Sequence, residues 1–174
     1  MLLAAWVAGL GGCGGKPQPA PQPLSPSGVV DVQVLDEQQL AAEVARHRGR
    51  VVLVDYWATW CAPCKALFPH HVELHRRLAS QGLVVISVSV DDPADRPAVL
   101  EFLKSQEATF ANFISLYGTS EQTIQRFQIP GGAVPHLKLY DRKGNLSATF
   151  GVDGKPLDPQ TIDKTVQQLL SGSA

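Results

Sequence analysis

The 174-residue chain lacks several features that define large classes of protein. Its three cysteines are too few for a disulfide-framework mini-protein or for a four-thiolate zinc site. No apolar run approaches the ~20 residues that a transmembrane helix needs. The formal net charge of −1 provides no electrostatic attraction for nucleic acid, so no nucleic-acid partner is expected. The apolar content of 44% instead indicates one globular domain with a short attachment.

An N-terminal export signal is indicated by residues 2–10, which read LLAAWVAGL and suit the apolar region of a secretory signal peptide. Small residues at 11–12 precede Cys13 in an arrangement that resembles a bacterial lipobox, although the usual positive charges are absent before Lys16. We expect residues 1–12 to be a lipoprotein signal peptide and Cys13 to be lipidated, which would anchor the chain to a bacterial membrane outside the cytoplasm. A plain signal peptide and a disordered N-terminus with an incidental cysteine remain alternatives.

Residues 13–27 are expected to form a linker, because prolines recur through them. Such spacing favours extended polyproline geometry and excludes helix and sheet. The prolines are Pro17, Pro19, Pro21, Pro23 and Pro26. The linker would be a semi-rigid spacer between a membrane anchor and a folded domain over residues 28–174.

Strands and helices are predicted to alternate through this domain. Strands are expected over residues 29–35, 50–57, 83–90, 112–115, 136–140 and 146–150. Helices are expected over residues 36–47, 61–80, 94–106, 120–127 and 158–170, with a kink at Pro69. This order predicts an α/β fold with a central mixed sheet flanked by helices on both faces.

A Cys-x-x-Cys motif, Cys61-Ala62-Pro63-Cys64, lies where the strand 50–57 meets the following helix. Half of a zinc site and a structural disulfide are possible interpretations, but the strand-to-helix position favours redox chemistry. At a helix N-terminus, free N–H groups and the macrodipole would favour a thiolate on Cys61. Cys64 would lie one turn further on the same face, Pro63 fits the first turn, and Trp60 would shield one side of the site.

The segment VDYWATWCAPCK (54–65) resembles the active-site strand, motif and helix of the thioredoxin superfamily. Asp55 falls where thioredoxins carry a buried acid, Pro69 where their helix kinks, and Pro135 where they carry a cis-proline that faces the cysteines. The resemblance covers residues 28–174 and implies a thioredoxin-like fold. It is strongest to the TlpA-like membrane-attached thiol–disulfide oxidoreductases, which implies an extra helix and strand at about 94–115.

Some positions depart from the family pattern. The approach to Pro135, residues 129–135 (IPGGAVP), is longer and richer in glycine than usual. Many TlpA-like proteins have Asn where this chain has Asp55. Ser87 stands near the position where thioredoxins pair a lysine with the buried acid, so that partner is missing.

The resemblance implies a mechanism in which Cys61 attacks a target disulfide and Cys64 resolves the mixed disulfide. Asp55, buried on its strand, would accept the proton of Cys64. The backbone of Val134, beside Pro135, would pair with an extended substrate segment, and Trp60 and Pro63 would also contact substrate. A structural carboxylate at Asp55 and an ordinary trans proline at 135 are the alternatives.

Other polar residues are interpreted as structural. His71 and His75 stand four residues apart on the helix 61–80, but no third ligand is evident, so they are interpreted as exposed helix histidines and no metal site is expected. Asp91, Asp92 and Asp95 are predicted to cap a helix and a loop. His136, next to Pro135, is expected to pack beside the site.

We therefore predict an enzyme, a thiol–disulfide oxidoreductase that acts as a reductase on protein partners in the periplasm or cell envelope. It would need no cofactor, take electrons from an upstream donor and be a monomer. The main alternative is a copper delivery protein on the same fold, although those use a CxxxC spacing and a distant histidine. A peroxiredoxin-like peroxidase would need a Pro-x-x-x-Thr-x-x-Cys context, which Cys61 lacks. A non-catalytic binding module is disfavoured by the intact cysteine pair.

Overall fold

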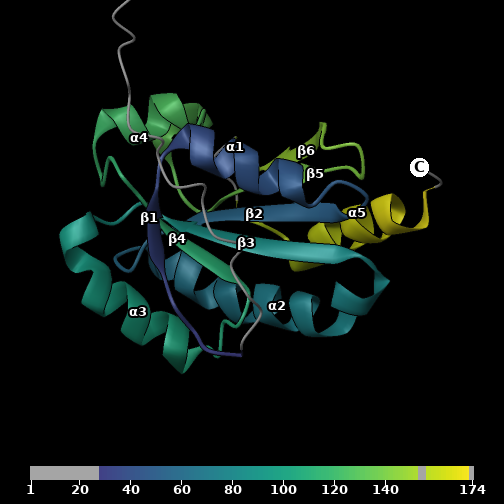
Figure 1. Ribbon diagram of the computed structural model, residues 1–174, viewed down its shortest axis with the longest axis horizontal. Coiled ribbons are helices and arrows are strands. Elements are labelled where there is room, and N and C mark those ends of the chain that lie inside the picture. Colours follow the sequence, from purple (N-terminus) through teal and green to yellow (C-terminus); the bar gives the residue numbers. More distant parts are fainter. Residues whose placement is uncertain (1–27, 153–155, 173–174) are drawn as a thin grey trace, which may run out of the picture.

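A mixed sheet of six strands in the order β1-β4-β3-β2-β5-β6 forms the centre of the computed structural model, which describes residues 28–152 and 156–172 (Figure 1). The strands are β1 (Gln33–Leu35), β2 (Val51–Trp57), β3 (Leu83–Ser89), β4 (Ala111–Ser115), β5 (His136–Tyr140) and β6 (Leu146–Phe150). β1, β4, β3 and β2 are parallel to one another, whereas β5 runs antiparallel to β2 and to β6. The predicted signal peptide, lipidation site and linker lie outside the described residues.

Helices cover both faces of the sheet, as the alternation of elements predicts (Figure 1). The helices are α1 (Glu37–Arg46), α2 (Ala62–Leu78), α3 (Arg96–Ser105), α4 (Glu121–Arg126) and α5 (Pro159–Ser171). α1 lies over one face, and α2 and α3 lie over the other. α5 joins the α2 side, where Asp163 bonds to Arg77. Among the described residues, no helix is long and apolar enough to cross a bilayer.

The central strands β2 and β3 form the core of the sheet. All seven residues of each strand are buried, because helices shield both faces of a parallel pair. On the α2 side, the ring of Trp57 packs against Phe68 at 5.0 Å between centroids, and Phe68 packs against Phe102 at 5.2 Å. Burial of such a side chain stabilises the fold by about 1.5–3 kcal/mol. The core therefore holds β2 firmly up to its last residue, where the active-site turn begins.

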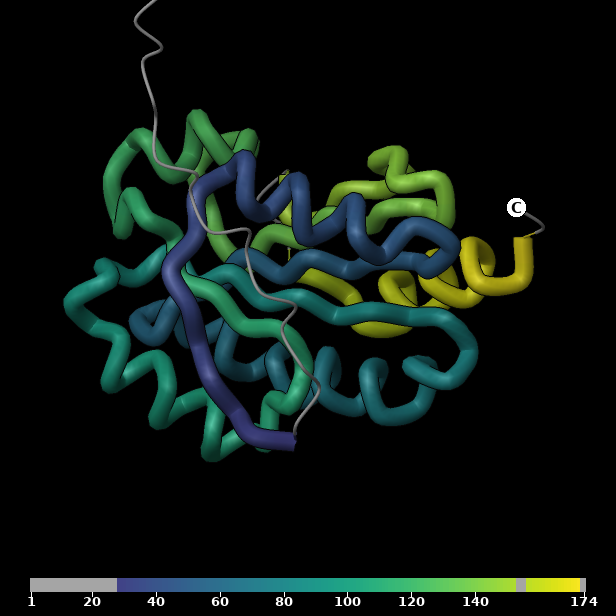
Figure 2. Tube along the Cα trace, in the orientation of Figure 1, coloured from purple at the N-terminus to yellow at the C-terminus, as the bar shows by residue number. Residues whose placement is uncertain are grey.

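The helix and strand expected between residues 94 and 115 are present as α3 and β4. β4 pairs with β3 on one side and with β1 on the other, so this segment supplies an interior strand of the sheet (Figure 2). The first strand is shorter than the predicted 29–35, since only residues 33–35 have partners, at 113–115 of β4. α2 continues through Pro69, and the kink there stays a prediction.

Candidate functional site

The cysteine motif occupies the turn from β2 into α2, at the carboxyl end of the parallel strands. Cys61 is the N-cap of α2, its Sγ accepts the N–H of Cys64 at 3.2 Å, and a disulfide joins the two cysteines. Pro63 stands in the first turn, where no backbone hydrogen bond is lost. After reduction, the N–H groups and the dipole of α2 would stabilise a thiolate on Cys61. The structure therefore has the arrangement that redox chemistry requires.

The loop before β5 lies against the cysteines. The Val134–Pro135 peptide bond is cis, and the carbonyl oxygen of Val134 lies 3.5 Å from Cys61 Sγ. Residues 73 positions apart in the chain are thus in contact, as the resemblance implies. The trans alternative for Pro135 is wrong.

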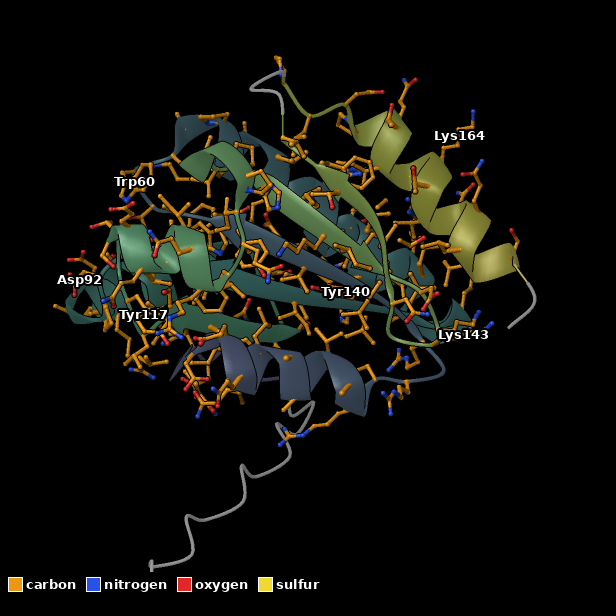
Figure 3. The ribbon with its side chains drawn as sticks, turned by 90° about the horizontal axis from the view of Figure 1, so that it is seen from above. Trp60, Asp92, Tyr117, Tyr140, Lys143 and Lys164 are labelled. Atoms are coloured by element: carbon orange, nitrogen blue, oxygen red, sulfur yellow. A yellow bond between two sulfur atoms is a disulfide. The ribbon has the colours of Figure 1, made fainter. Side chains whose placement is uncertain are left out.

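An apolar groove of about 450 Å³ begins beside the disulfide. Its lining includes Pro63 and Leu67 from α2 and Val134 and Pro135 from the facing loop. Trp60 is 61% exposed and projects from the same end of the molecule as Asp92, a residue that follows β3 (Figure 3). Trp60 borders a smaller hollow that also reaches Val134. The four residues predicted to contact substrate therefore surround Cys61.

Asp55 is buried on β2, as predicted, and its partner is a histidine that the sequence analysis did not assign to it. Asp55 Oδ2 lies 2.9 Å from His71 Nδ1, and the two side chains are 3% and 1% exposed. Ser87 faces Asp55 in the strand register, but its hydroxyl donates to Asn112 Oδ1 at 2.8 Å. The interpretation of His71 as an exposed helix histidine is therefore wrong, because its face of α2 packs on the sheet.

Asp91 holds the turn that precedes Cys61. Its carboxylate accepts the N–H of Thr59 at 2.9 Å, the hydroxyl of Thr59 at 2.6 Å and the hydroxyl of Ser89 at 2.5 Å. Of the three aspartates predicted to cap, Asp92 does so, because its side chain accepts the N–H of Ala94, whereas Asp95 precedes α3 without a side-chain capping bond. Asp91 is 1% exposed, so β3 is tied through a buried carboxylate to the active-site turn.

The strand after the cis bond carries a buried histidine and lies close to a glycine. His136 packs against Tyr56, with ring centroids 5.8 Å apart, which agrees with the predicted packing role. Burial lowers the pKa of His136 to about 4, so its ring is neutral at pH 7. Gly151, at a φ of 80°, approaches so closely that a Cβ there would press against the carbonyl oxygen of Pro135. The sequence contained no pattern that marked Gly151.

The mixed sheet, the cysteine pair at a helix N-terminus and the facing cis-proline define a thioredoxin-like protein, which confirms the predicted fold class. The sequence profile of the AhpC/TSA family matches residues 28–149, and the chain belongs to that family.

Named relatives agree with this assignment. The "Thiol-disulfide oxidoreductase ResA" of Bacillus subtilis (strain 168) is 30% identical over 104 residues, which are 60% of this chain and 54% of the relative. A crystal structure of a "thiol:disulfide interchange protein, thioredoxin family protein" from Chlorobium tepidum TLS has a TM-score of 0.60 and 25% identity, covering 73% of this chain and 84% of that one. A DsbF homologue from Corynebacterium diphtheriae shares the fold with a TM-score of 0.61 at 21% identity, over 72% of this chain and 76% of its own.

The predicted likeness to TlpA-like thiol–disulfide oxidoreductases is therefore confirmed. The chain spans about half the length of the curated relatives it matches.

Proposed function

We propose that this chain is a thiol–disulfide oxidoreductase that exchanges a dithiol for a disulfide with protein partners through Cys61 and Cys64. The observation that carries the proposal is the disulfide at the start of α2, which lies against the carbonyl oxygen of Val134. The names of the relatives support the same activity.

In the reducing direction, the Cys61 thiolate attacks one sulfur of a partner disulfide. A Cys61–partner disulfide forms, and the other partner sulfur leaves as a thiolate that takes up a proton. Cys64 then transfers its proton to Asp55 and attacks Cys61 Sγ. The Cys61–Cys64 disulfide forms and the second partner thiolate leaves, so two electrons pass to the partner. An upstream dithiol donor must reduce the pair again.

Substrate would lie along the apolar groove beside Cys61. The backbone of Val134 would pair with an extended segment of the partner, as an added strand does. Trp60, Pro63 and Pro135 would contact the residues that flank the partner cysteine. Because this surface is mostly apolar, shape and backbone pairing rather than charge would select the partner.

The proposal extends to location and assembly. Residues 1–12 would direct export, a lipid on Cys13 would anchor the chain to a bacterial membrane, and residues 13–27 would space the domain from it. The domain over residues 28–174 would act as a monomer in the periplasm or cell envelope. Mass spectrometry of membrane-extracted protein tests this: a diacylglycerol adduct on Cys13 supports the anchor, and an unmodified or uncleaved N-terminus contradicts it.

A Cys64→Ala variant tests the activity. It is expected to accumulate mixed disulfides through Cys61, because the resolving thiol is gone, whereas Cys61→Ala is expected to trap none. Wild-type chain should reduce insulin with dithiothreitol as the electron donor. If no partner is trapped and no dithiol or disulfide substrate turns over, the assignment is wrong.

The direction of electron flow, and the copper-delivery and peroxidase alternatives, are tested on the same protein. Equilibration with a glutathione redox series gives the potential: a value near the ~−270 mV of thioredoxin supports a reductase, and one near the ~−120 mV of DsbA contradicts it. Copper binding through both cysteines without disulfide turnover would favour the delivery protein. Peroxide consumption that exceeds disulfide turnover would favour the peroxidase.

A further inference from the structure

Asp55 of β2 and His71 of α2 form a buried acid–imidazole pair on the two elements that flank the cysteine motif. The two side chains are 3% and 1% exposed, and Oδ2 lies 2.9 Å from Nδ1. Asp55 Oδ1 and His71 Nε2 are buried and have no hydrogen-bond partner among the described residues. Among the described residues, the bond between them is therefore the one side-chain hydrogen bond that either group makes.

The two residues belong to the elements that carry the two cysteines. β2 runs from Asp55 into the turn at Cys61, and α2 runs from Cys64 to His71. Cys64 and His71 are seven residues apart, which places them on one face of α2, two turns from each other. Phe68 lies between them on the helix, with its ring centroid 6.4 Å from that of His71 and 5.0 Å from that of Trp57, so an aromatic cluster borders His71.

The hydrogen bond fixes where protons can reside. An ionised carboxylate only accepts, so the Nδ1–H of His71 donates to Asp55 Oδ2. An added proton can sit on Asp55 Oδ1 or on His71 Nε2, and in both cases the Nδ1–H still donates to Oδ2, so the bond persists.

Few other charges face the pair. His70 precedes His71 on α2 and lies against Asp163 of α5, with 2.8 Å between Nε2 and Oδ1. His136, on β5, interacts electrostatically with Asp55. Burial lowers the pKa of both His70 and His136, and Ser87 of β3 is neutral.

We propose that His71 is a positioning residue for Asp55: it holds the carboxylate and shares the proton that Asp55 takes from Cys64. The inference rests on the proposed function and concerns only the resolving step. In that step the Cys64 S–H bond breaks, the proton passes to the pair, and Cys64 Sγ displaces the partner thiolate from Cys61. In this chain His71 thus supplies the contact that the missing lysine leaves open.

Ellman's reagent, dithiobis-nitrobenzoate, separates the two steps in one experiment on the reduced full chain, with Cys13→Ser present in every protein compared so that Cys61 and Cys64 are the only thiols. Attack by Cys61 releases a first thionitrobenzoate, and resolution by Cys64 releases a second. In His71→Leu, we expect the second release to slow about 10- to 100-fold and the first to stay within about twofold, because a lost hydrogen bond to a charged group has an effect of this size. His71→Gln, which keeps an N–H donor, should recover part of the loss.

Controls separate positioning from a general structural effect. His75→Leu, one turn further along α2, should leave both releases within about twofold of wild type. In an Asp55→Asn background, His71→Leu should cause no further slowing, because the carboxylate it serves is gone. If the single His71→Leu variant does not fold, His71→Gln decides the matter: its second release alone should be slower than in wild type, and an unchanged second release or equal slowing of both releases would overturn the inference.

Equal slowing of both releases in His71→Leu would overturn the inference. So would a double variant whose second release is slowed by the product of the two single-variant factors, because the two residues would then act independently. If His71→Leu releases the second thionitrobenzoate as fast as wild type does, the role of His71 is refuted. The oxidoreductase assignment is then unaffected. A wild-type chain that releases no thionitrobenzoate at all would instead refute the proposed function.

Discussion

The close approach of Gly151 to the cis-proline loop predicts that Gly151→Ala will be strongly destabilising. Gly151 has a φ of 80°, and a Cβ there would overlap the carbonyl oxygen of Pro135 and lie 3.3 Å from His136 Cα. Both neighbours are backbone atoms, so a side-chain rotation cannot relieve the overlap. The loop that faces Cys61 would have to move.

Two effects add at this position. An alanine at positive φ costs about 1–2 kcal/mol, and forcing an extra methyl group into a packed site costs about 1–3 kcal/mol. The sum, about 2–5 kcal/mol, is a large part of the ~5–15 kcal/mol that stabilises a typical domain. At about 2–4 °C per kcal/mol for a chain of this size, the melting temperature should fall by about 4–20 °C.

Gly131→Ala is the matched control, because Gly131 has a similar φ of 70° but no atom within 4 Å of its would-be Cβ. It should show the backbone cost alone, about 1–2 kcal/mol. Thermal and urea unfolding of both oxidised variants measure the difference. If Gly151→Ala is no less stable than Gly131→Ala, the close packing of Gly151 on Pro135 does not constrain this loop and the reasoning is wrong.

Three further predictions follow from buried or exposed groups near the site. Burial lowers the pKa of His136 to about 4, so as the pH falls below about 6.5 this histidine binds a proton in the unfolded chain but not in the folded one. The free energy of unfolding should therefore drop by about 2 kcal/mol between about pH 7 and about pH 4.5. Urea titrations should show that His136→Phe loses this dependence, and an unchanged pH slope would contradict it. Asp91→Ala leaves the buried donors of Thr59 and Ser89 unpaired and should lower the free energy of unfolding by about 2–4 kcal/mol. The control Asp92→Ala should lower it by about 1 kcal/mol or less. Equal losses in urea unfolding would show that Asp91 does not anchor the turn. Trp60→Ala should change the free energy of unfolding by less than about 0.5 kcal/mol, since the ring is exposed. It should slow the reduction of insulin more than the reduction of Ellman's reagent, and equal slowing of both would show that Trp60 does not contact the protein partner.

The redox motif and the order of elements were predictable because their signals are local. A buried strand that runs into Cys61, with Pro63 in the first helical turn, specifies a strand–turn–helix unit within about fifteen residues. The ends of strands were not predictable in this way. The first strand, expected over 29–35, is limited to Gln33–Leu35 by its pairing with β4. Pairing depends on a partner about 80 residues away, which periodicity cannot locate.

The partners of individual polar groups were not predictable for the same reason. His71 looked like a surface histidine because its helix also carries exposed polar residues, and only the rotation of α2 on the sheet turns it toward Asp55. Asp91 looked like a cap because it follows a strand and precedes a helix, and only the bend at Thr59 brings donors to it.

The sequence by itself determined the chemistry of this protein: two cysteines at the start of a helix, an acid on the preceding strand and a proline before a later strand. Those features depend on backbone preferences and hydrophobic periodicity, which act over short stretches of chain. The tertiary structure alone decided that His71 contacts Asp55 and that Gly151 leaves room for the Pro135 carbonyl. Such contacts are set by sheet register and helix packing, which bring together residues that no local pattern relates.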